Sequence, residues 1–132
     1  MTEVTCAVIV DVEGHVFAAQ RSEVMSLPLK WEFPGGKIEP NETPKNCLLR
    51  EIKEELNIEV QIIQELPRHI HHYPNFTIQL IPFICYRLSG GIILKEHSQF
   101  KWLHPNELLA LDWAEADLPI VKSYLNLINV NR

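Results

Sequence analysis

The sequence predicts an α/β fold, with helices packed on both faces of a central mixed β-sheet. Two long apolar runs, residues 2–10 and 77–88, are typical of buried strands. Two other segments, residues 44–56 and 119–129, instead repeat apolar residues at helical spacing. The chain has 132 residues, 46% of them hydrophobic and 22% charged, without a repeat or linker. We therefore expect a single domain, residues 1–132, that buries roughly two-thirds of its unfolded surface.

The strands and turns of the first third follow from local patterns. The run at residues 2–10 is turned by 11–14 into a second strand at 15–20. Residues 21–30 read as an irregular loop, residues 31–33 as a short strand, and Pro34-Gly35-Gly36 as a turn.

The next element is a helix with signals at both ends. Thr43 can cap its start, and Pro44 suits the first helical position, where a missing N–H costs nothing. Asn57 is expected to end the helix in the left-handed conformation. At about 100° per residue, the expected apolar stripe consists of Leu48, Leu49, Ile52 and Leu56.

The remaining elements complete the sheet and its second cover. Residues 59–66 and 68–72 look extended, and 77–88 form a long apolar strand. A loop at Gly90-Gly91 leads to an extended run that ends at Leu94, and residues 100–103 are the last strand. Helices are expected at 105–111 and 119–129.

Three acids of the first helix carry the chemistry. Glu51, Glu54 and Glu55 fall on one sector beside the apolar stripe, where they repel one another unless a cation lies among them. Oxygen ligands of this kind suit Mg²⁺ or Mn²⁺. The alternative is a solvated acidic face, with Arg50 and Glu54 as an ordinary i,i+4 pair.

The spacing around these acids decides between the two interpretations. Residues 36–58 resemble the Nudix box, G-x5-E-x7-R-E-U-x-E-E-x-G-U with U aliphatic, at eight of its nine specified positions. The one departure is Asn57 in place of glycine, and Asn is the best non-glycine residue for a left-handed helix end. The resemblance extends to the MutT-like branch through residues 31–39, Glu96-His97 and residues 112–119.

The resemblance implies a Nudix-type α/β/α sandwich and a hydrolase of phosphoanhydride bonds. In the family, Glu51, Glu54 and Glu55 would bind Mg²⁺ or Mn²⁺ together with the backbone carbonyl of Gly36 or its neighbour. Glu96 would complete the metal cluster or activate water. Either Glu51 or Glu96 can serve as the general base.

Three basic residues have expected roles beside the acids. Arg50 is expected to orient Glu42 and the catalytic acids through charge-assisted hydrogen bonds. Arg21 and Lys37 are expected to meet phosphate charge, although an ordinary surface cation is the alternative for each.

Three aromatic side chains and one carboxyl group are expected to recognise the base. Phe33, Tyr73 and Phe76 can stack on a nucleobase, with core packing as the alternative. Asp117 stands where MutT-like enzymes carry an Asn or Asp that faces the base edge. An ionised Asp only accepts hydrogen bonds, whereas a protonated one can both accept and donate. Asp117 can therefore meet the N–H edge of an oxidised guanine or the amino group of a cytosine. A helix cap ahead of Pro119 is its alternative role.

The expected function is a metal-dependent nucleoside-triphosphate pyrophosphohydrolase that releases nucleoside monophosphate and pyrophosphate, acting on oxidised dGTP (8-oxo-dGTP). The alternatives are a pyrophosphohydrolase for CTP or modified dCTP, and a Nudix-fold module that binds a nucleotide without hydrolysing it. The net charge of −5 argues against a nucleic-acid polymer as partner. No membrane partner is expected, the default location is the cytoplasm, and monomer and homodimer both remain open.

Overall fold

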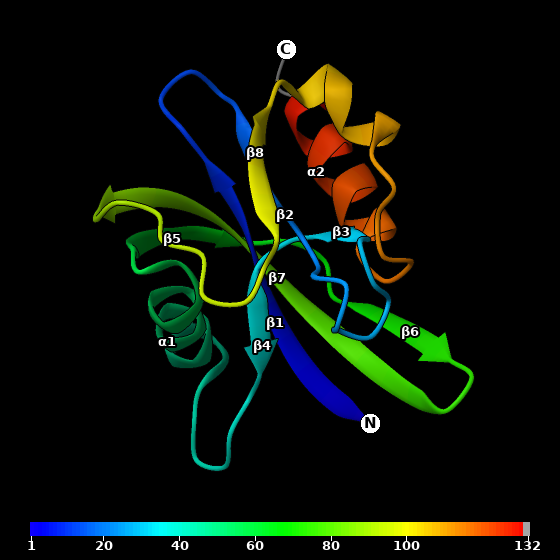
Figure 1. Ribbon diagram of the computed structural model, residues 1–132. Coiled ribbons are helices and arrows are strands. Elements are labelled where there is room, and N and C mark those ends of the chain that lie inside the picture. Colours follow the sequence, from blue (N-terminus) through cyan, green and yellow to red (C-terminus); the bar gives the residue numbers. More distant parts are fainter. Residues whose placement is uncertain (131–132) are drawn as a thin grey trace.

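Residues 1–130 are described by the computed structural model, in which eight strands, two α-helices and one 3₁₀ helix follow in the order seen in Figure 1. The elements are β1 (Thr2–Val10), β2 (Val16–Gln20), β3 (Trp31–Glu32), β4 (Gly35–Lys37), α1 (Pro44–Leu56), β5 (Glu59–Glu65), β6 (His69–Tyr73), β7 (Phe76–Ser89), β8 (Gln99–Leu103), η1 (Pro105–Ala110) and α2 (Leu118–Val130).

The sheet is mixed, as the sequence predicted, and is built on the parallel pair β1 and β7. These strands pair along the whole of β1, from Thr2 beside Ile78 to Val10 beside Tyr86. The order across the sheet is β3-β2-β1-β7-β5, with β4 also paired to β1, β6 to β7 and β8 to β2.

Both long strands change neighbour along their length. β4 pairs antiparallel with the first half of β1, whereas β2 pairs with its end at Val10. β6 and β5 divide β7 in the same way. Because β3 pairs with β2 and β4 with β1, the chain crosses between the two strands at Phe33-Pro34. Ala7 N–H fixes this crossing by donating to the Pro34 carbonyl at 2.8 Å.

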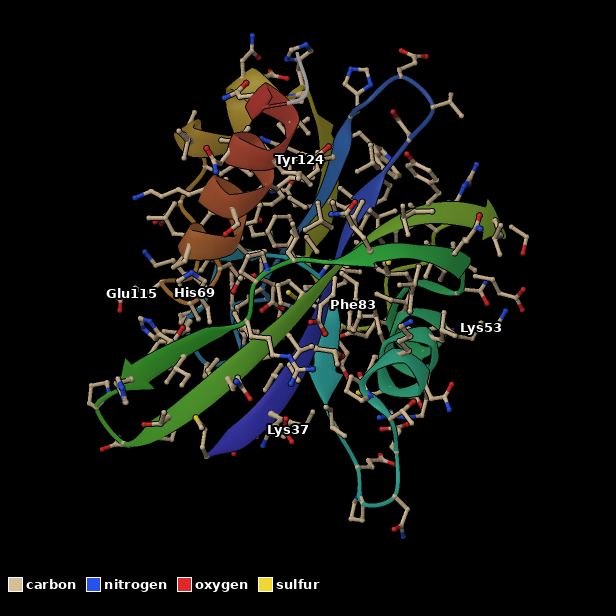
Figure 2. The ribbon with its side chains drawn as sticks, turned by 180° about the vertical axis from the view of Figure 1, so that it is seen from behind. Lys37, Lys53, His69, Phe83, Glu115 and Tyr124 are labelled. Atoms are coloured by element: carbon tan, nitrogen blue, oxygen red, sulfur yellow. The ribbon has the colours of Figure 1, made fainter. Side chains whose placement is uncertain are left out.

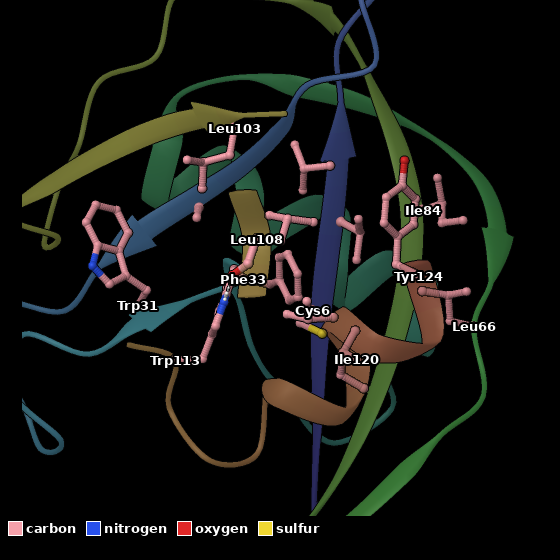
Figure 3. Packing of buried hydrophobic residues seen from close by; sticks show 14 of the residues in the cluster. Cys6, Trp31, Phe33, Leu66, Ile84, Leu103, Leu108, Trp113, Ile120 and Tyr124 are labelled. Atoms are coloured by element: carbon pink, nitrogen blue, oxygen red, sulfur yellow. Dashed lines mark hydrogen bonds between the residues drawn. The ribbon is translucent and has the colours of Figure 1, made fainter. Parts of the chain in front are cut away.

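Alternation along β1 directs apolar side chains to both faces of the sheet. Ala7 and Ile9 pack under α1, while Cys6 and Val8 belong to the core that α2 and η1 cover. In Figure 2, Tyr124 of α2 and Lys53 of α1 lie on opposite sides of the sheet. Figure 3 shows the α2-side core, in which Phe33 and Trp113 pack near Cys6.

The helix that carries the acids begins and ends as predicted. Thr43 Oγ1 accepts from Asn46 N–H at 3.1 Å, and Asn57 is left-handed at φ 61° and ψ 27°. The predicted apolar stripe was wrong at one position. Leu49 is 40% exposed, and Cys47 instead completes the buried face with Leu48, Ile52 and Leu56.

Three other expectations need correction. Gly35-Gly36 belong to strand β4 rather than to a turn, because they pair with Cys6 and Thr5. The run that ends at Leu94 is not a strand. Residues 105–110 form a 3₁₀ helix rather than an α-helix.

The three cysteines, Cys6, Cys47 and Cys85, are buried and free. No helix within residues 1–130 is long and apolar enough to cross a membrane.

Candidate active site

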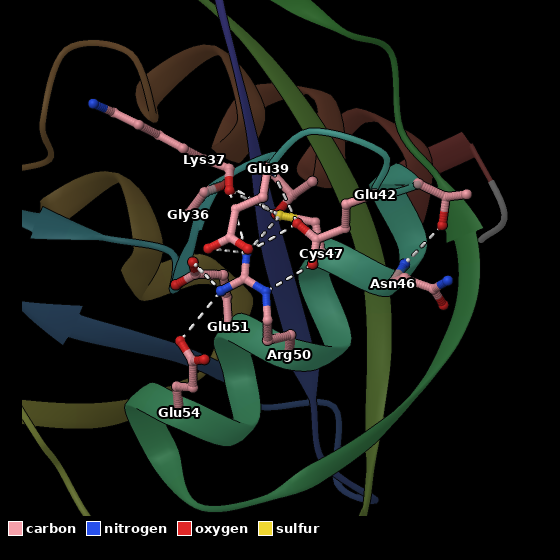
Figure 4. Close-up of polar contacts among 11 residues, drawn as sticks. Gly36, Lys37, Glu39, Glu42, Asn46, Cys47, Arg50, Glu51 and Glu54 are labelled. Atoms are coloured by element: carbon pink, nitrogen blue, oxygen red, sulfur yellow. Dashed lines mark hydrogen bonds and ion pairs between the residues drawn. The ribbon is translucent and has the colours of Figure 1, made fainter.

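Arg50 is the centre of the polar contacts on α1 (Figure 4). Its Nε and Nη2 donate to the two oxygens of Glu42 at 2.7 and 2.9 Å, which is a bidentate pair. These bonds lower the pKa of Glu42 to about 2, helped by the backbone N–H of Glu39. Nη1 donates to Glu51 at 2.8 Å and to Glu54 at 3.2 Å. Arg50 therefore contacts Glu42 and two of the three helix acids.

Glu51 lies against the backbone of β4. Its side chain is 18% exposed, and burial raises the pKa of its carboxyl, while Arg50 opposes this shift. A Cβ at Gly36 would overlap the Glu51 carboxylate, so any other residue there would require Glu51 to move. The Gly36 carbonyl accepts from Thr5 Oγ1 at 3.2 Å, which ties it to β1. Because position 36 has no side chain, the Glu51 carboxylate can lie against the backbone of Gly36.

Glu55 is the most buried of the helix acids. Its Oε2 accepts from the Gly35 N–H at 3.0 Å. Burial raises the pKa of Glu55 to about 9, and the negative charges of Glu51, Glu32 and Glu96 add to the shift. Three other carboxylates are therefore close enough to Glu55 to influence it, and a divalent cation would relieve that repulsion.

The other two acids differ in exposure. The Glu54 side chain is 60% exposed and accepts from Arg50 Nη1 at 3.2 Å. Glu96 is exposed on the irregular segment that follows β7, yet its charge acts on Glu55. Within residues 1–130, no group of three His, Cys, Asp or Glu side chains is arranged as a ready-made metal site. Arg50 holds two of the carboxylates that would contribute to one.

The residue set fits a divalent cation. It offers carboxylate oxygens and a backbone carbonyl, which are the ligands that Mg²⁺ and Mn²⁺ prefer. Glu51, Glu55 and the Gly36 carbonyl would hold the ion, with Glu54 and Glu96 nearest to solvent.

Two residues beside this cluster were missed by the sequence analysis as functional candidates. Glu32 accepts from Arg21 Nη1 at 2.8 Å, and its other oxygen lies 2.8 Å from Nε2 of His97. The His97 side chain has no exposed surface. The pair is separated by 65 residues, and the only local signal was the Glu96-His97 dipeptide.

Asp117 lies on the α2 side of the sheet, buried beside Phe33. Its Oδ2 accepts from Phe33 N–H at 2.8 Å. Burial raises the pKa of Asp117 to about 8, and the charge of Glu32 adds to this shift. Asp117 therefore holds a proton at neutral pH and has both donor and acceptor capacity. Its carboxylate oxygen points to β3 rather than to the first turn of α2, which disfavours the cap role.

Of the three rings expected near a base, Phe33 and Tyr73 lie near Asp117, and Phe76 packs on Tyr73. Phe33 is 3% exposed and packs against Trp113 with ring centroids 4.8 Å apart, so it belongs to the core. Tyr73 is half-buried, and its hydroxyl accepts from Ala116 N–H at 3.3 Å. Phe76 is 56% exposed and packs on Tyr73 at 5.0 Å. The β6–β7 hairpin tip therefore lies beside Asp117.

The two expected phosphate ligands, Arg21 and Lys37, differ in exposure. The Arg21 side chain is largely buried. Its guanidinium is already engaged, because it donates to Glu32 and to both the carbonyl and the hydroxyl of Ser26. Lys37 is exposed at the end of β4 and directs its ammonium away from the Arg50 contacts (Figure 4). Their binding of phosphate stays a prediction, as do the catalytic roles of the acids.

The crossing between β3 and β4 connects the two groups of candidate residues. Phe33 N–H holds Asp117, and Gly35 N–H holds Glu55. Glu32, at the start of the crossing, influences both carboxyls. A substrate with its base at Asp117 and its phosphates at Glu55 would span this crossing.

A separate cavity of about 930 Å³ opens beside the C-terminal end of β1. Val10, Asp11, Tyr86 and Trp102 are among its lining residues, and none of the candidate site residues lines it. The candidate site therefore lies outside this cavity.

Comparisons with known proteins show which family and which relatives this chain resembles. The NUDIX domain family matches residues 1–124. The CTP pyrophosphohydrolase of Escherichia coli (strain K12) is 32% identical over 127 residues, 96% of this chain and 93% of its own. The 8-oxo-dGTP diphosphatase of Proteus vulgaris is 42% identical over 95 residues, 72% of this chain and 85% of its own.

A solved structure supports the fold. The DNA mismatch repair protein MutT, a Nudix hydrolase from methicillin-resistant Staphylococcus aureus 252, is 40% identical and covers 95% of each chain, with a TM-score of 0.76.

Proposed function

Because this chain belongs to the NUDIX domain family, we propose that it is a metal-dependent nucleoside-triphosphate pyrophosphohydrolase. The reaction releases nucleoside monophosphate and pyrophosphate. The preferred substrate is an oxidised dGTP (8-oxo-dGTP), so that the protein removes damaged precursors from the nucleotide pool. The metal is Mg²⁺ or Mn²⁺.

One observation carries the proposal: the buried carboxyl of Glu55 accepts from Gly35 N–H and is close enough to feel the charges of three other acids, one of which, Glu51, lies against Gly36. Such crowding of acids is unfavourable in a protein that binds no cation. A divalent ion bound there would neutralise phosphate charge and lower the pKa of an attacking water.

The chain's own groups have separate tasks in the proposed reaction. Arg50 holds Glu51 in place through Nη1 while its other nitrogens hold Glu42. Glu51 or Glu96 accepts the proton of the attacking water. The water oxygen bonds to an inner phosphorus, and the bond to the bridging oxygen breaks, so that pyrophosphate leaves.

Asp117 is the proposed reader of the base. As a protonated carboxyl, it can donate to a ring acceptor and accept from an N–H. This pattern suits the edge of an oxidised guanine, and it also suits cytosine. CTP or modified dCTP therefore remains the second candidate, supported by the relative named CTP pyrophosphohydrolase, which aligns with 96% of this chain.

A nucleotide panel tests the activity and the base together. Purified protein is given 8-oxo-dGTP, dGTP, CTP and dCTP with Mg²⁺, and pyrophosphate release is measured. We expect the highest kcat/KM for 8-oxo-dGTP and no release in EDTA. A higher value for CTP or dCTP would reverse the two substrate candidates.

The same assay distinguishes an enzyme from a binding module. Tight nucleotide binding without pyrophosphate release, in both Mg²⁺ and Mn²⁺, would overturn the proposed hydrolysis. Such modules usually lose acids of the box, whereas this chain keeps Glu51, Glu54 and Glu55.

A further inference from the structure

His97 is a buried imidazole whose one hydrogen-bond partner within residues 1–130 is a carboxylate. Its Nε2 lies 2.8 Å from Oε2 of Glu32. A carboxylate offers only acceptors, so Nε2 carries the hydrogen. The other ring nitrogen, Nδ1, is buried without a partner in this part of the chain. An apolar side chain would fill the same space without an unpaired polar atom, so the imidazole is not explained by packing.

His97 lies in an irregular segment that also carries Glu96. Residues 90–98 have no regular secondary structure, so no strand pairing fixes the side chains that they carry. Lys95 N–H anchors the segment to α1 through the Glu55 carbonyl at 3.2 Å, and Ser98 N–H anchors it to the end of β2 at 3.0 Å. Glu96 lies between the first of these anchors and His97.

Glu32 is a second acid that acts on Glu55. It begins the β3–β4 crossing, and its charge, like that of Glu96, acts on Glu55. Arg21 holds one oxygen of Glu32 and His97 faces the other. The imidazole therefore joins the segment that carries Glu96 to the strand that carries Glu32, and both of these acids influence Glu55.

We propose that His97 is a positioning residue of the acid cluster, which fixes Glu96 and Glu32 relative to Glu55. The inference rests on the proposed function. His97 would not touch substrate; it would act through the carboxylates that it places. Loss of its hydrogen bond should weaken cation binding and slow turnover while nucleotide affinity changes little.

Two substitutions separate this role from packing. His97→Leu fills the site without a donor, whereas His97→Gln keeps an N–H that can reach Glu32. Mn²⁺ affinity is measured without nucleotide, and kcat and KM are measured for the preferred nucleotide. We expect His97→Leu to lose about 10- to 100-fold in Mn²⁺ affinity and kcat, the usual effect of removing a group that orients metal ligands. KM should change far less, and His97→Gln should recover most of both losses.

Two further variants serve as controls. His104→Leu makes the same change at an exposed histidine whose ring caps η1. Val16→Ala lowers stability at a buried position in β2, away from the acids. Both should retain wild-type Mn²⁺ affinity and kcat. If His97→Leu does not fold, His97→Asn replaces it, because its amide is too short to reach Glu32.

Wild-type Mn²⁺ affinity in His97→Leu, or equal defects in His97→Leu and His97→Gln, would overturn the inference. A wild-type protein that binds Mn²⁺ but hydrolyses no nucleotide would refute the proposed function alone, because the Mn²⁺ comparison still tests His97.

Discussion

Gly36 is required by its neighbours rather than by an unusual backbone conformation. A Cβ there would overlap the Glu51 carboxylate, and the Gly36 carbonyl is held by Thr5 Oγ1 from β1. The strand has little room to retreat, because Thr5 and Cys6 pair with β4 on that side. Any side chain at position 36 must therefore displace Glu51.

Gly36→Ala should lower kcat by about 10- to 100-fold, since a displaced ligand acts like a lost orienting contact. Mn²⁺ affinity should fall with it. Gly91→Ala is the matched control, because a Cβ at Gly91 would meet open space. Steady-state kinetics and calorimetric Mn²⁺ titration measure both effects. Wild-type activity in Gly36→Ala would show that Glu51 is not needed where it lies.

Asp117 gives stability a pH dependence. Burial raises the pKa of its carboxyl to about 8 in the folded chain, against an ordinary value of 3.8. Between these values the folded state binds more protons than the unfolded state, so stability falls as pH rises. One group can contribute about 1.4 kcal/mol for each pH unit within this window.

Asp117→Asn should remove this contribution and keep the acceptor for Phe33 N–H. The unfolding free energy of the variant should therefore fall less steeply between pH 5 and about pH 8. Urea unfolding at several pH values measures the slopes. Equal slopes for both proteins would show that Asp117 is ionised throughout that range.

The ends of α1 are set by Thr43 and Asn57, and each can be tested alone. Asn57 is left-handed, so Asn57→Gly should be neutral or mildly stabilising, and Asn57→Val should cost about 1 kcal/mol or more. Thr43→Ala should cost about 1 kcal/mol through loss of its cap hydrogen bond. Thermal unfolding measures all three. A marked loss of stability in Asn57→Gly would contradict the conformational explanation.

The same helix shows how much the sequence could predict. Its caps, its box acids and most of its buried face follow from residues within one or two turns, and the structure agrees with them. The prediction that Leu49 is buried was wrong, because helical spacing alone does not say where the buried face of a helix ends. Cys47 is buried instead.

Contacts between distant residues explain what the sequence did not predict. β4 forms because Gly35 and Gly36 pair with β1, about thirty residues earlier, although the glycines themselves favour a turn. The Glu32–His97 contact joins residues 65 apart. No local pattern distinguishes such a histidine from one that is exposed.

Cation binding should be visible in the stability of the whole molecule. An ion that binds only the folded state stabilises it by about 2.7 kcal/mol at one hundred times its dissociation constant. Mn²⁺ should therefore raise the melting temperature of the wild type. Glu55→Gln should melt higher than the wild type in EDTA, because it removes a carboxyl whose pKa burial raises, and should respond less to Mn²⁺. An equal Mn²⁺ response in both proteins would exclude Glu55 as a ligand.

The parallel pairing of β1 with β7 has a consequence for biosynthesis. β1 is synthesised before the other strands of the sheet, but the segment of β7 that pairs with it ends at Tyr86, more than half the chain later. β2 and β4 together pair with only four of its residues, so they protect it incompletely. Until β7 has been synthesised, the apolar side chains of β1 stay exposed and can bind chaperones or other nascent chains. Synthesis of β7 therefore marks the point after which β1 can be paired along its whole length.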